Sequence, residues 1–282
     1  MARQTATLSG ALEHSVDFAR EAWREAWAPL ALQALGVAMV YLSFQAPLGF
    51  GPAVLMFLTG LVMSLAACPP AWGALYRLAL GVDLGEIGPG GLQWGETETR
   101  LTMVWGMFLL LLAVIWFPLS AAAALAFYLF RDAGGVYLGL FGKVQIGFLA
   151  ALGIMVAGGF GWSWLLLRLS LASAATVVEG KVMMFDAWSL TAGRSLKIGL
   201  AWLILHLPTV GSWGLALLLT LIEAKASGTV KALPLPEAIG TALVIGAVSG
   251  FMQTPLAIGA FGYFHRPRPA EAASPLRFAE GL

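Results

Sequence analysis

The sequence predicts an all-α, polytopic membrane protein with six transmembrane helices, and three observations support this prediction. Apolar residues make up 59% of the 282 residues and charged residues only 11%, whereas an ordinary soluble domain carries about 25% charged residues. The apolar residues gather in six long runs, and Lys and Arg gather on one side of these runs. A soluble globule needs more polar side chains than this on its surface, so we expect the chain to lie in a lipid bilayer.

Each of the six apolar runs is long enough to cross a bilayer, which takes about 20 helical residues. Backbone amides in hydrocarbon must be paired within their own segment, so we expect helices. A transmembrane β-barrel would show short alternating segments instead, and the sequence has none. The predicted spans are residues 28–47, 53–76, 102–128, 144–168, 197–222 and 238–264. Together they form a predicted transmembrane domain of residues 28–264.

Lys and Arg are distributed unevenly between the two sides of the predicted spans. Twelve of the 16 lie in the N-terminal segment, in the connections 77–100 and 168–197, and in the C-terminal segment. By the positive-inside rule the side rich in Lys and Arg is cytoplasmic, so we expect both termini in the cytoplasm. An even number of spans requires the two termini to share a side, and this count was inferred independently from the apolar runs.

Two segments that precede predicted spans have the pattern of amphipathic helices. In residues 12–27, an apolar stripe lies opposite acidic residues and an Arg. In residues 181–197, a second stripe lies opposite Asp186, Arg194 and Lys197. Such helices lie in the membrane plane with the apolar face at headgroup depth. The two stripes are Leu12, Val16, Ala19, Trp23, Ala26 and Trp27, and Met184, Phe185, Trp188, Ala192 and Leu196.

These patterns divide the chain into three parts. Residues 1–27 are predicted as a cytoplasmic surface helix, followed by the transmembrane domain. The polar, proline-containing segment 265–282 is predicted as a disordered cytoplasmic tail.

An internal repeat is suggested by two pairs of matching segments. "ALYRLAL" (74–80) resembles "LLLRLSL" (165–171), and "IWFPLS" (115–120) resembles "LHLPTV" (205–210). The copies would have the same membrane orientation, with a symmetry axis along the membrane normal. Biased composition is the alternative explanation.

The connection that begins at Arg168 has a distinctive pattern. An Arg ends a long apolar run, a run of small residues follows, and a Glu-Gly pair precedes a segment with Trp, Leu, Thr and Gly. This pattern resembles the membrane domain associated with glycerophosphoryl diester phosphodiesterases and related uncharacterised bacterial six-helix membrane proteins. The matching residues are Arg168, Glu179, Gly180, Trp188, Leu190, Thr191 and Gly193.

The resemblance covers this connection well and the six-span layout loosely. The chemistry of that family belongs to a separate soluble catalytic domain, and no segment of this sequence could fold into one. The resemblance therefore implies a membrane module without phosphodiesterase activity. The expected localisation is the bacterial inner (cytoplasmic) membrane.

Four residues at the predicted cytoplasmic interface form a candidate lipid- or partner-binding site. Arg77 and Arg168 end two spans at matching repeat positions, and Trp188 and Arg194 belong to the amphipathic segment. Guanidinium groups at such a depth could bind lipid phosphates. The alternative is snorkelling, in which the aliphatic stem stays in hydrocarbon while the charged group reaches water.

Helix-breaking sequences suggest a transport path. "CPP" (68–70) and "GGFG" (158–161) are predicted to interrupt spans two and four at corresponding repeat positions, and paired breaks of this kind mark transporter binding sites. Alternatively, Pro and Gly are simply common in membrane helices.

Three further residues of spans five and six belong to the candidate path: His206, Pro208 and Gln253. His206 lies about 14 Å into its span at 1.5 Å per residue, and an ionisable group near the bilayer centre is a functional candidate. The alternative is a neutral imidazole that donates to a carbonyl freed by Pro208. Gln253, which precedes Pro255, has the same two interpretations.

Membrane lipids are the expected partners, and Gly246 and Gly250 are candidates for self-association because a small-xxx-small pair lets helices approach closely. The net charge of +1 gives no indication of nucleic-acid binding. No cofactor, metal-ligand cluster or catalytic motif is apparent.

The sequence leads to two functional hypotheses. The first is a non-enzymatic inner-membrane protein that organises lipids or membrane partners through cytoplasmic surface helices. The alternative is a transporter or permeation pathway for a small amphiphilic molecule.

Overall fold

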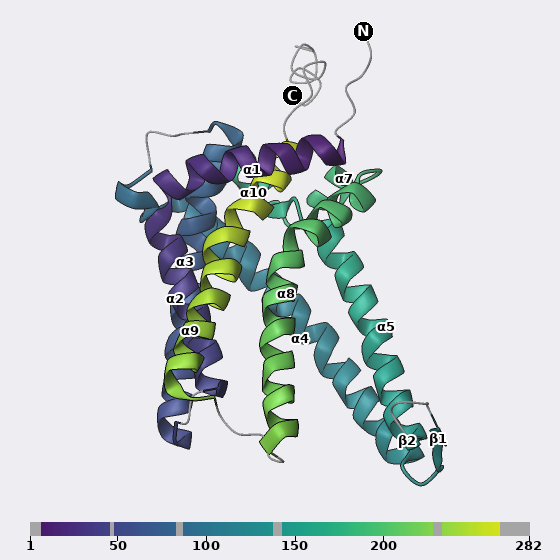
Figure 1. The fold of residues 1–282 in the computed structure, drawn as a ribbon. Coiled ribbons are helices and arrows are strands. Elements are labelled where there is room, and N and C mark those ends of the chain that lie inside the picture. The colour runs from purple at the N-terminus through teal and green to yellow at the C-terminus, as the bar shows by residue number, and fades with distance from the viewer. Residues whose placement is uncertain (1–6, 46–47, 83–86, 138–142, 228–232, 266–282) are drawn as a thin grey trace.

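The computed structural model describes residues 7–45, 48–82, 87–137, 143–227 and 233–265 and is a membrane-type helical bundle (Figure 1). Among these residues, six helical segments are long and apolar enough to cross a bilayer. The predicted all-α fold class and the predicted number of spans are therefore confirmed. The six segments are Trp27–Gln45, Phe50–Leu80, Pro89–Phe130, Ile146–Glu179, Ser195–Ala216 and Leu235–His265.

The elements follow one another with short connections. The first five are α1 (Leu8–Glu25), α2 (Trp27–Gln45), α3 (Phe50–Leu80), the 3-10 turn η2 (Pro89–Gly91) and α4 (Glu96–Phe130). The next five are β1 (Gly135–Tyr137), β2 (Lys143–Gln145), α5 (Ile146–Leu169), α6 (Ala172–Glu179) and α7 (Ala187–Leu190). The last four are α8 (Ser195–Ser227), α9 (Leu235–Gly246), the π-helical segment η4 (Ala247–Met252) and α10 (Gln253–His265).

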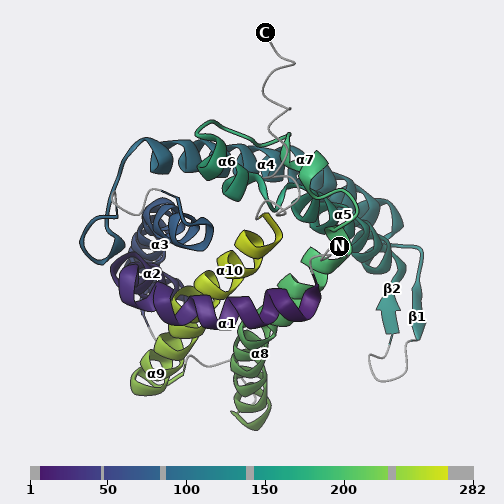
Figure 2. The same cartoon turned by 90° about the horizontal axis from the view of Figure 1, so that it is seen from above.

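The helices form two closely packed groups. α2 packs along α3 and α9, and α4 packs along α5. Seen from above, α3, α4, α5 and α8 lie around α10, and α1 crosses one end of the bundle (Figure 2). α1 packs on α10, so the first and last described helices meet at the same end, as an even number of spans requires.

α1 is a helix where the sequence predicts one, and its buried side overlaps the predicted stripe only in part, at Ala19 and the following Ala26. Ala11, Phe18 and Ala22 are buried against the bundle, whereas Val16 of the predicted stripe remains exposed. The buried face of α1 therefore packs on the helical bundle. Gly259 makes this possible, because a Cβ there would lie 3.0 Å from the Cα of Ser15.

A hydrogen bond fixes α1 to the last span. The Phe251 carbonyl would normally accept from the N–H of residue 255, but Pro255 has none. The indole Nε1 of Trp23 donates to this carbonyl at 2.9 Å, and the Trp23 and Phe251 rings stack at a centroid distance of 6.3 Å. The surface helix thus satisfies a backbone group that the proline leaves open.

The prediction of a single amphipathic helix for residues 181–197 is wrong. The segment instead contains the four-residue helix α7 and a turn before α8, in which Gly193 has a φ of +71°. A left-handed residue suits Gly and interrupts a helix. The predicted stripe is also divided, because Met184 is buried while Phe185 and Leu196 are exposed.

The predicted breaks in spans two and four are also wrong. α3 continues through Pro69 and Pro70, and α5 continues through residues 158–161. Proline removes single backbone hydrogen bonds from a helix, whereas an open segment would leave several amides unpaired in hydrocarbon. A continuous helix therefore has the lower free energy in a membrane. The irregular segment lies in span six instead, where η4 is π-helical and Gln253 N donates to the Val248 carbonyl.

Gly246 and Gly250 pack inside the chain. A Cβ on Gly250 would lie 2.6 Å from the backbone nitrogen of Ala34, and a Cβ on Gly246 would lie 3.1 Å from the Cβ of Ala38. The pair therefore brings span six against α2. Both glycines have their close neighbours within the chain, and self-association through them stays a prediction.

The far end of the bundle carries a β-hairpin that the sequence did not indicate (Figure 1). β1 and β2 pair antiparallel, with Val136 opposite Val144. The predicted disordered tail lies, apart from His265, outside the described residues.

Candidate functional site: an intramembrane cavity

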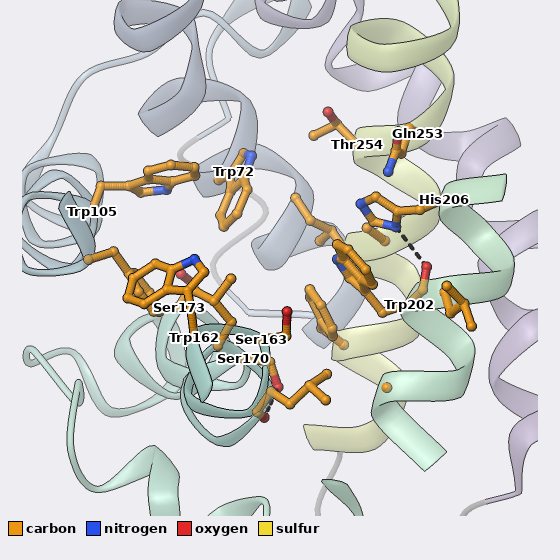
Figure 3. Close-up of a pocket in the computed structure, with 18 of the residues that line it drawn as sticks. Trp72, Trp105, Trp162, Ser163, Ser170, Ser173, Trp202, His206, Gln253 and Thr254 are labelled. Carbon is orange, nitrogen blue, oxygen red and sulfur yellow. Dashed lines mark hydrogen bonds between the residues drawn. The ribbon is translucent and has the colours of Figure 1, made fainter. Parts of the chain in front are cut away.

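A cavity of about 860 Å³ lies among α3, α4, α5, α8 and α10 (Figure 3). Its volume is within the range of roughly 300–1,000 Å³ that small-molecule sites occupy. We call it the intramembrane cavity. It lies within the spanning part of the chain, below α1.

The cavity occupies one half of the membrane-spanning region. On span six its lining extends from Ser249 to Phe261, and on α8 it extends from Leu196 to His206. These separations correspond to roughly 18 Å and 15 Å at 1.5 Å per residue. Since the hydrocarbon core is about 30 Å thick, the cavity extends from the α1 end to near the bilayer centre. Among the described residues, its lining does not reach the hairpin end of the bundle.

Tryptophans form much of the cavity wall. Trp72 of α3 and Trp105 of α4 are in edge-to-face contact, with ring centroids 4.8 Å apart. Figure 3 shows them with Trp162 on one side of the cavity, while His206 and Gln253 lie on the other. Leu and Phe side chains complete a wall that is mostly apolar. Such a wall accommodates the body of an amphiphile better than that of a polar solute.

Exposed side chains of α5 and α8 contribute to the cavity lining. These helices meet near α7, where a Cβ on Gly199 would lie 3.0 Å from Leu167. They then diverge toward the other end of the bundle (Figure 1). The lining residues Phe160, Leu196 and Leu203 are 74%, 76% and 51% exposed. Lining residues of both helices are therefore accessible from outside the bundle.

His206 is a half-buried polar group of the cavity wall. Its Nδ1 lies 2.7 Å from the Trp202 carbonyl oxygen. A carbonyl oxygen can only accept, so the neutral ring carries its hydrogen on Nδ1 and Nε2 is an acceptor. The predicted alternative, a bond to the carbonyl freed by Pro208, is wrong. Pro208 frees the carbonyl of Ile204, four residues earlier, and the ring binds Trp202.

Gln253 lies on the same side of the cavity and is only 8% exposed. Its Oε1 accepts a hydrogen bond from the Thr209 hydroxyl on α8. The neighbouring Thr254 hydroxyl donates to Gln33 Oε1 on α2 at 3.1 Å. Span six is thus bonded to two neighbouring helices at the level of the cavity.

The predicted transport-path residues are partly brought together. His206 and Gln253 both line the cavity, whereas Pro208 does not. The sequence did not identify Trp72, Trp105, Trp162 or Trp202. The one sequence feature that could have identified them is their position well inside apolar runs, away from the membrane interface where tryptophan is common.

Arg77 does not have the predicted lipid-binding role in this structure. It is 3% exposed and pairs with Glu98, which is fully buried, at an Nη1–Oε1 distance of 2.7 Å. Glu98 Oε1 also accepts from Gln93 Nε2 at 3.2 Å, and Oε2 accepts from the Gly95 N–H at 2.9 Å. A guanidinium held in this way cannot also reach a headgroup phosphate.

Arg168 and Trp188 do meet at the bundle surface. The Arg168 guanidinium lies 4.6 Å from the centre of the Trp188 ring, a cation–π geometry, and its Nη1 donates to Ser195 Oγ at 3.2 Å. Trp188 is 36% exposed. Arg194 lies elsewhere, because its Nη1 donates to the Phe264 carbonyl at the end of α10 at 2.9 Å. The four predicted residues therefore do not form one site.

The described residues contain no group of three or more His, Cys, Asp or Glu side chains placed to hold a metal ion. Comparison with protein-family models, with curated proteins and with solved structures found no match. The resemblance to the phosphodiesterase-associated membrane domain stays a prediction.

Proposed function

We propose that the protein is a transporter or permeation pathway for a small amphiphilic molecule, which enters the intramembrane cavity sideways from one leaflet. The observation that supports this most directly is the cavity itself. It is large and aromatic-lined, lies between the surface and the bilayer centre, and has exposed lining residues between α5 and α8.

The chemistry of the wall favours an amphiphile over an ion or a sugar. Among the described residues that line the cavity there is no Asp, Glu, Lys or Arg, so an ion would have no opposite charge there to pair with. The few polar groups, including His206 and Gln253, are placed among apolar side chains. A ligand with a long apolar part and a small polar part matches this distribution.

The uneven distribution of Lys and Arg supports a cytoplasmic location of the α1 end. In this proposal the protein is a multi-pass bacterial inner-membrane protein, and the ligand enters from the cytoplasmic leaflet. Cysteines at the exposed positions Ser9 and Asp132, in a Cys68→Ala background, test this orientation. In intact cells, a membrane-impermeant maleimide should label only the one at 132. Labelling of position 9 instead would reverse the orientation.

A second candidate function is the non-enzymatic organisation of lipids or membrane partners. The exposed Trp188 ring under Arg168 supports it, since aromatic and cationic groups together suit a headgroup region. The structure supports this function less than the sequence does, because residues 181–197 form no continuous surface helix and Arg77 is paired with Glu98.

Flux in proteoliposomes tests the first proposal. Ser163→Phe places a bulky ring in the cavity, whereas Val156→Phe places the same ring at an exposed position of α5 outside the lining. A fluorescent short-chain amphiphile loaded in both leaflets should become accessible to an external quencher faster with protein present. We expect Ser163→Phe to lower this rate about tenfold or more and Val156→Phe to leave it unchanged. Equal rates with and without protein would remove the transport proposal and leave the second candidate.

A further inference from the structure

We propose that the intramembrane cavity selects an uncharged hydroxyl head group, so that its ligand is a long-chain alcohol or a related neutral lipid alcohol. This inference rests on the proposed function and adds the chemical class of the ligand. Four features of the cavity support it: an acceptor, a donor, the absence of charge in the lining and the depth of the polar groups.

The acceptor is Nε2 of His206. The bond from Nδ1 to the Trp202 carbonyl fixes the tautomer and leaves Nε2 with a free lone pair. The ring is also held in place by stacking on Trp202, with a centroid distance of 4.0 Å and an interplanar angle of 27°. A ligand hydrogen directed at Nε2 would meet a fixed acceptor rather than a mobile one.

The donor is the amide nitrogen of Gln253. Its carbonyl oxygen accepts from the Thr209 hydroxyl, which orients the side chain. Thr209 lies one turn from His206 on α8. Among the described residues, no hydrogen-bond acceptor is found for the Gln253 amide nitrogen, although the residue is more than nine-tenths buried and lines the cavity. The amide nitrogen is thus a donor on the cavity wall, beside an oxygen that is already engaged, and a ligand oxygen would supply its acceptor.

The two groups complement the chemistry of one hydroxyl, because one accepts its hydrogen and the other donates to its oxygen. A hydroxyl donates one hydrogen bond and accepts others, so it could bond His206 Nε2 and the Gln253 amide together. An ether or methyl ester lacks the hydrogen that Nε2 requires. Figure 3 shows His206 and Gln253 on the same wall, across the cavity from Trp72 and Trp105.

Charge and depth exclude an ionised head group. His206 lies eleven residues into α8, or roughly 16 Å at 1.5 Å per residue, which is close to the bilayer centre. A carboxylate or ammonium group at this depth needs an opposite charge. The lining residues provide none.

Competition in lipid nanodiscs tests the inference. Dibrominated octadecanol quenches nearby indoles, and the cavity wall contains Trp72, Trp105, Trp162 and Trp202. Brominated alcohol dissolved in the bulk bilayer also quenches tryptophan, but this part of the quenching does not saturate. The part that an unbrominated competitor relieves in a saturable way therefore reports binding in the cavity. The competitors are octadecanol, its methyl ether and stearate at a pH where stearate is ionised.

We expect octadecanol to compete, its methyl ether to compete about three- to tenfold more weakly because it lacks one hydrogen bond, and ionised stearate to compete at least tenfold more weakly. His206→Phe keeps a ring beside Trp202 but removes the acceptor, and Gln253→Leu removes the donor. Each should weaken octadecanol binding by about three- to tenfold, as loss of one hydrogen bond does. His206→Gln, which restores an acceptor, should recover part of the loss. Val156→Phe should bind like the parent protein.

The possible results separate the two proposals. Equal competition by all three compounds, with no effect of His206→Phe or Gln253→Leu in variants that remain monodisperse, would overturn the head-group inference and leave the proposed function standing. Quenching that no competitor relieves would overturn both, because no amphiphile would then occupy the cavity.

Discussion

Glu98 is fully buried, and three groups donate to its carboxylate: the guanidinium of Arg77, the side-chain amide of Gln93 and the backbone N–H of Gly95. A buried carboxylate needs such compensation. Gly73 leaves room for it, since any Cβ there would collide with the carboxylate. Together these contacts join the end of α3 to the beginning of α4, two of the helices that enclose the cavity.

Removing one member of this pair should destabilise the protein strongly. Glu98→Ala leaves the Arg77 guanidinium buried without its counter-charge, which costs roughly 3–5 kcal/mol in such settings. We expect a clearly lower melting temperature in detergent. Glu96→Ala is the matched control, because Glu96 pairs with Arg100 at an exposed position and exposed pairs contribute little. Equal melting temperatures for the two variants would contradict this role of Glu98.

The residue scale also shows what the sequence could and could not predict. His206 and Gln253 could be selected because polar side chains inside apolar runs are rare. The partner of Arg77 could not, because Glu98 lies 21 residues away across a Gly-rich connection and looks like an ordinary first-turn residue of a helix. For Arg77 the snorkelling interpretation is wrong as well, because its guanidinium is buried against Glu98.

At the scale of elements, α1 and span six are joined by Trp23, Phe251 and Pro255. The proline removes an N–H from the helix, and the indole replaces it as donor to the Phe251 carbonyl. Ser249 and Gln253, on either side of Phe251, line the cavity. The surface helix therefore contacts the backbone of the cavity wall.

A double-mutant cycle measures this contact. Trp23→Phe removes the indole donor but keeps an aromatic ring, and we expect it to cost about 1–3 kcal/mol because the carbonyl is left unpaired. Pro255→Ala restores the N–H at 255, so in that background the cost of Trp23→Phe should be much smaller. Thermal unfolding of the four proteins gives the coupling. Additive effects would mean that Trp23 stabilises α1 only through ring packing.

Elements with long uniform patterns were predicted well, and short elements were not. The six spans and α1 follow from apolar runs and from a helical stripe. Residues 181–197 have a helical stripe too, but Gly193 adopts a positive φ and Met184 is buried in the core. Here the tertiary contacts, rather than the local periodicity, determine the structure. The breaks expected at "CPP" and "GGFG" failed because neighbouring turns keep a membrane helix intact around single lost hydrogen bonds.

At the scale of the whole molecule, the cavity results from how the helices diverge. α4 stays with α5, while α8 stays with α10, and the space between these groups is bordered by tryptophans from four helices. No local pattern encodes such a space, because it depends on which helices pack and at what angle. The sequence therefore indicated two of its polar residues but not the cavity.

The central claim is that an amphiphile occupies the intramembrane cavity, and native mass spectrometry tests it most directly. Protein released gently from lipid nanodiscs should carry one bound amphiphile, and Val156→Phe should carry it too, whereas Ser163→Phe should lose it. A parent protein without any bound amphiphile, or equal occupancy in Ser163→Phe, would contradict the account.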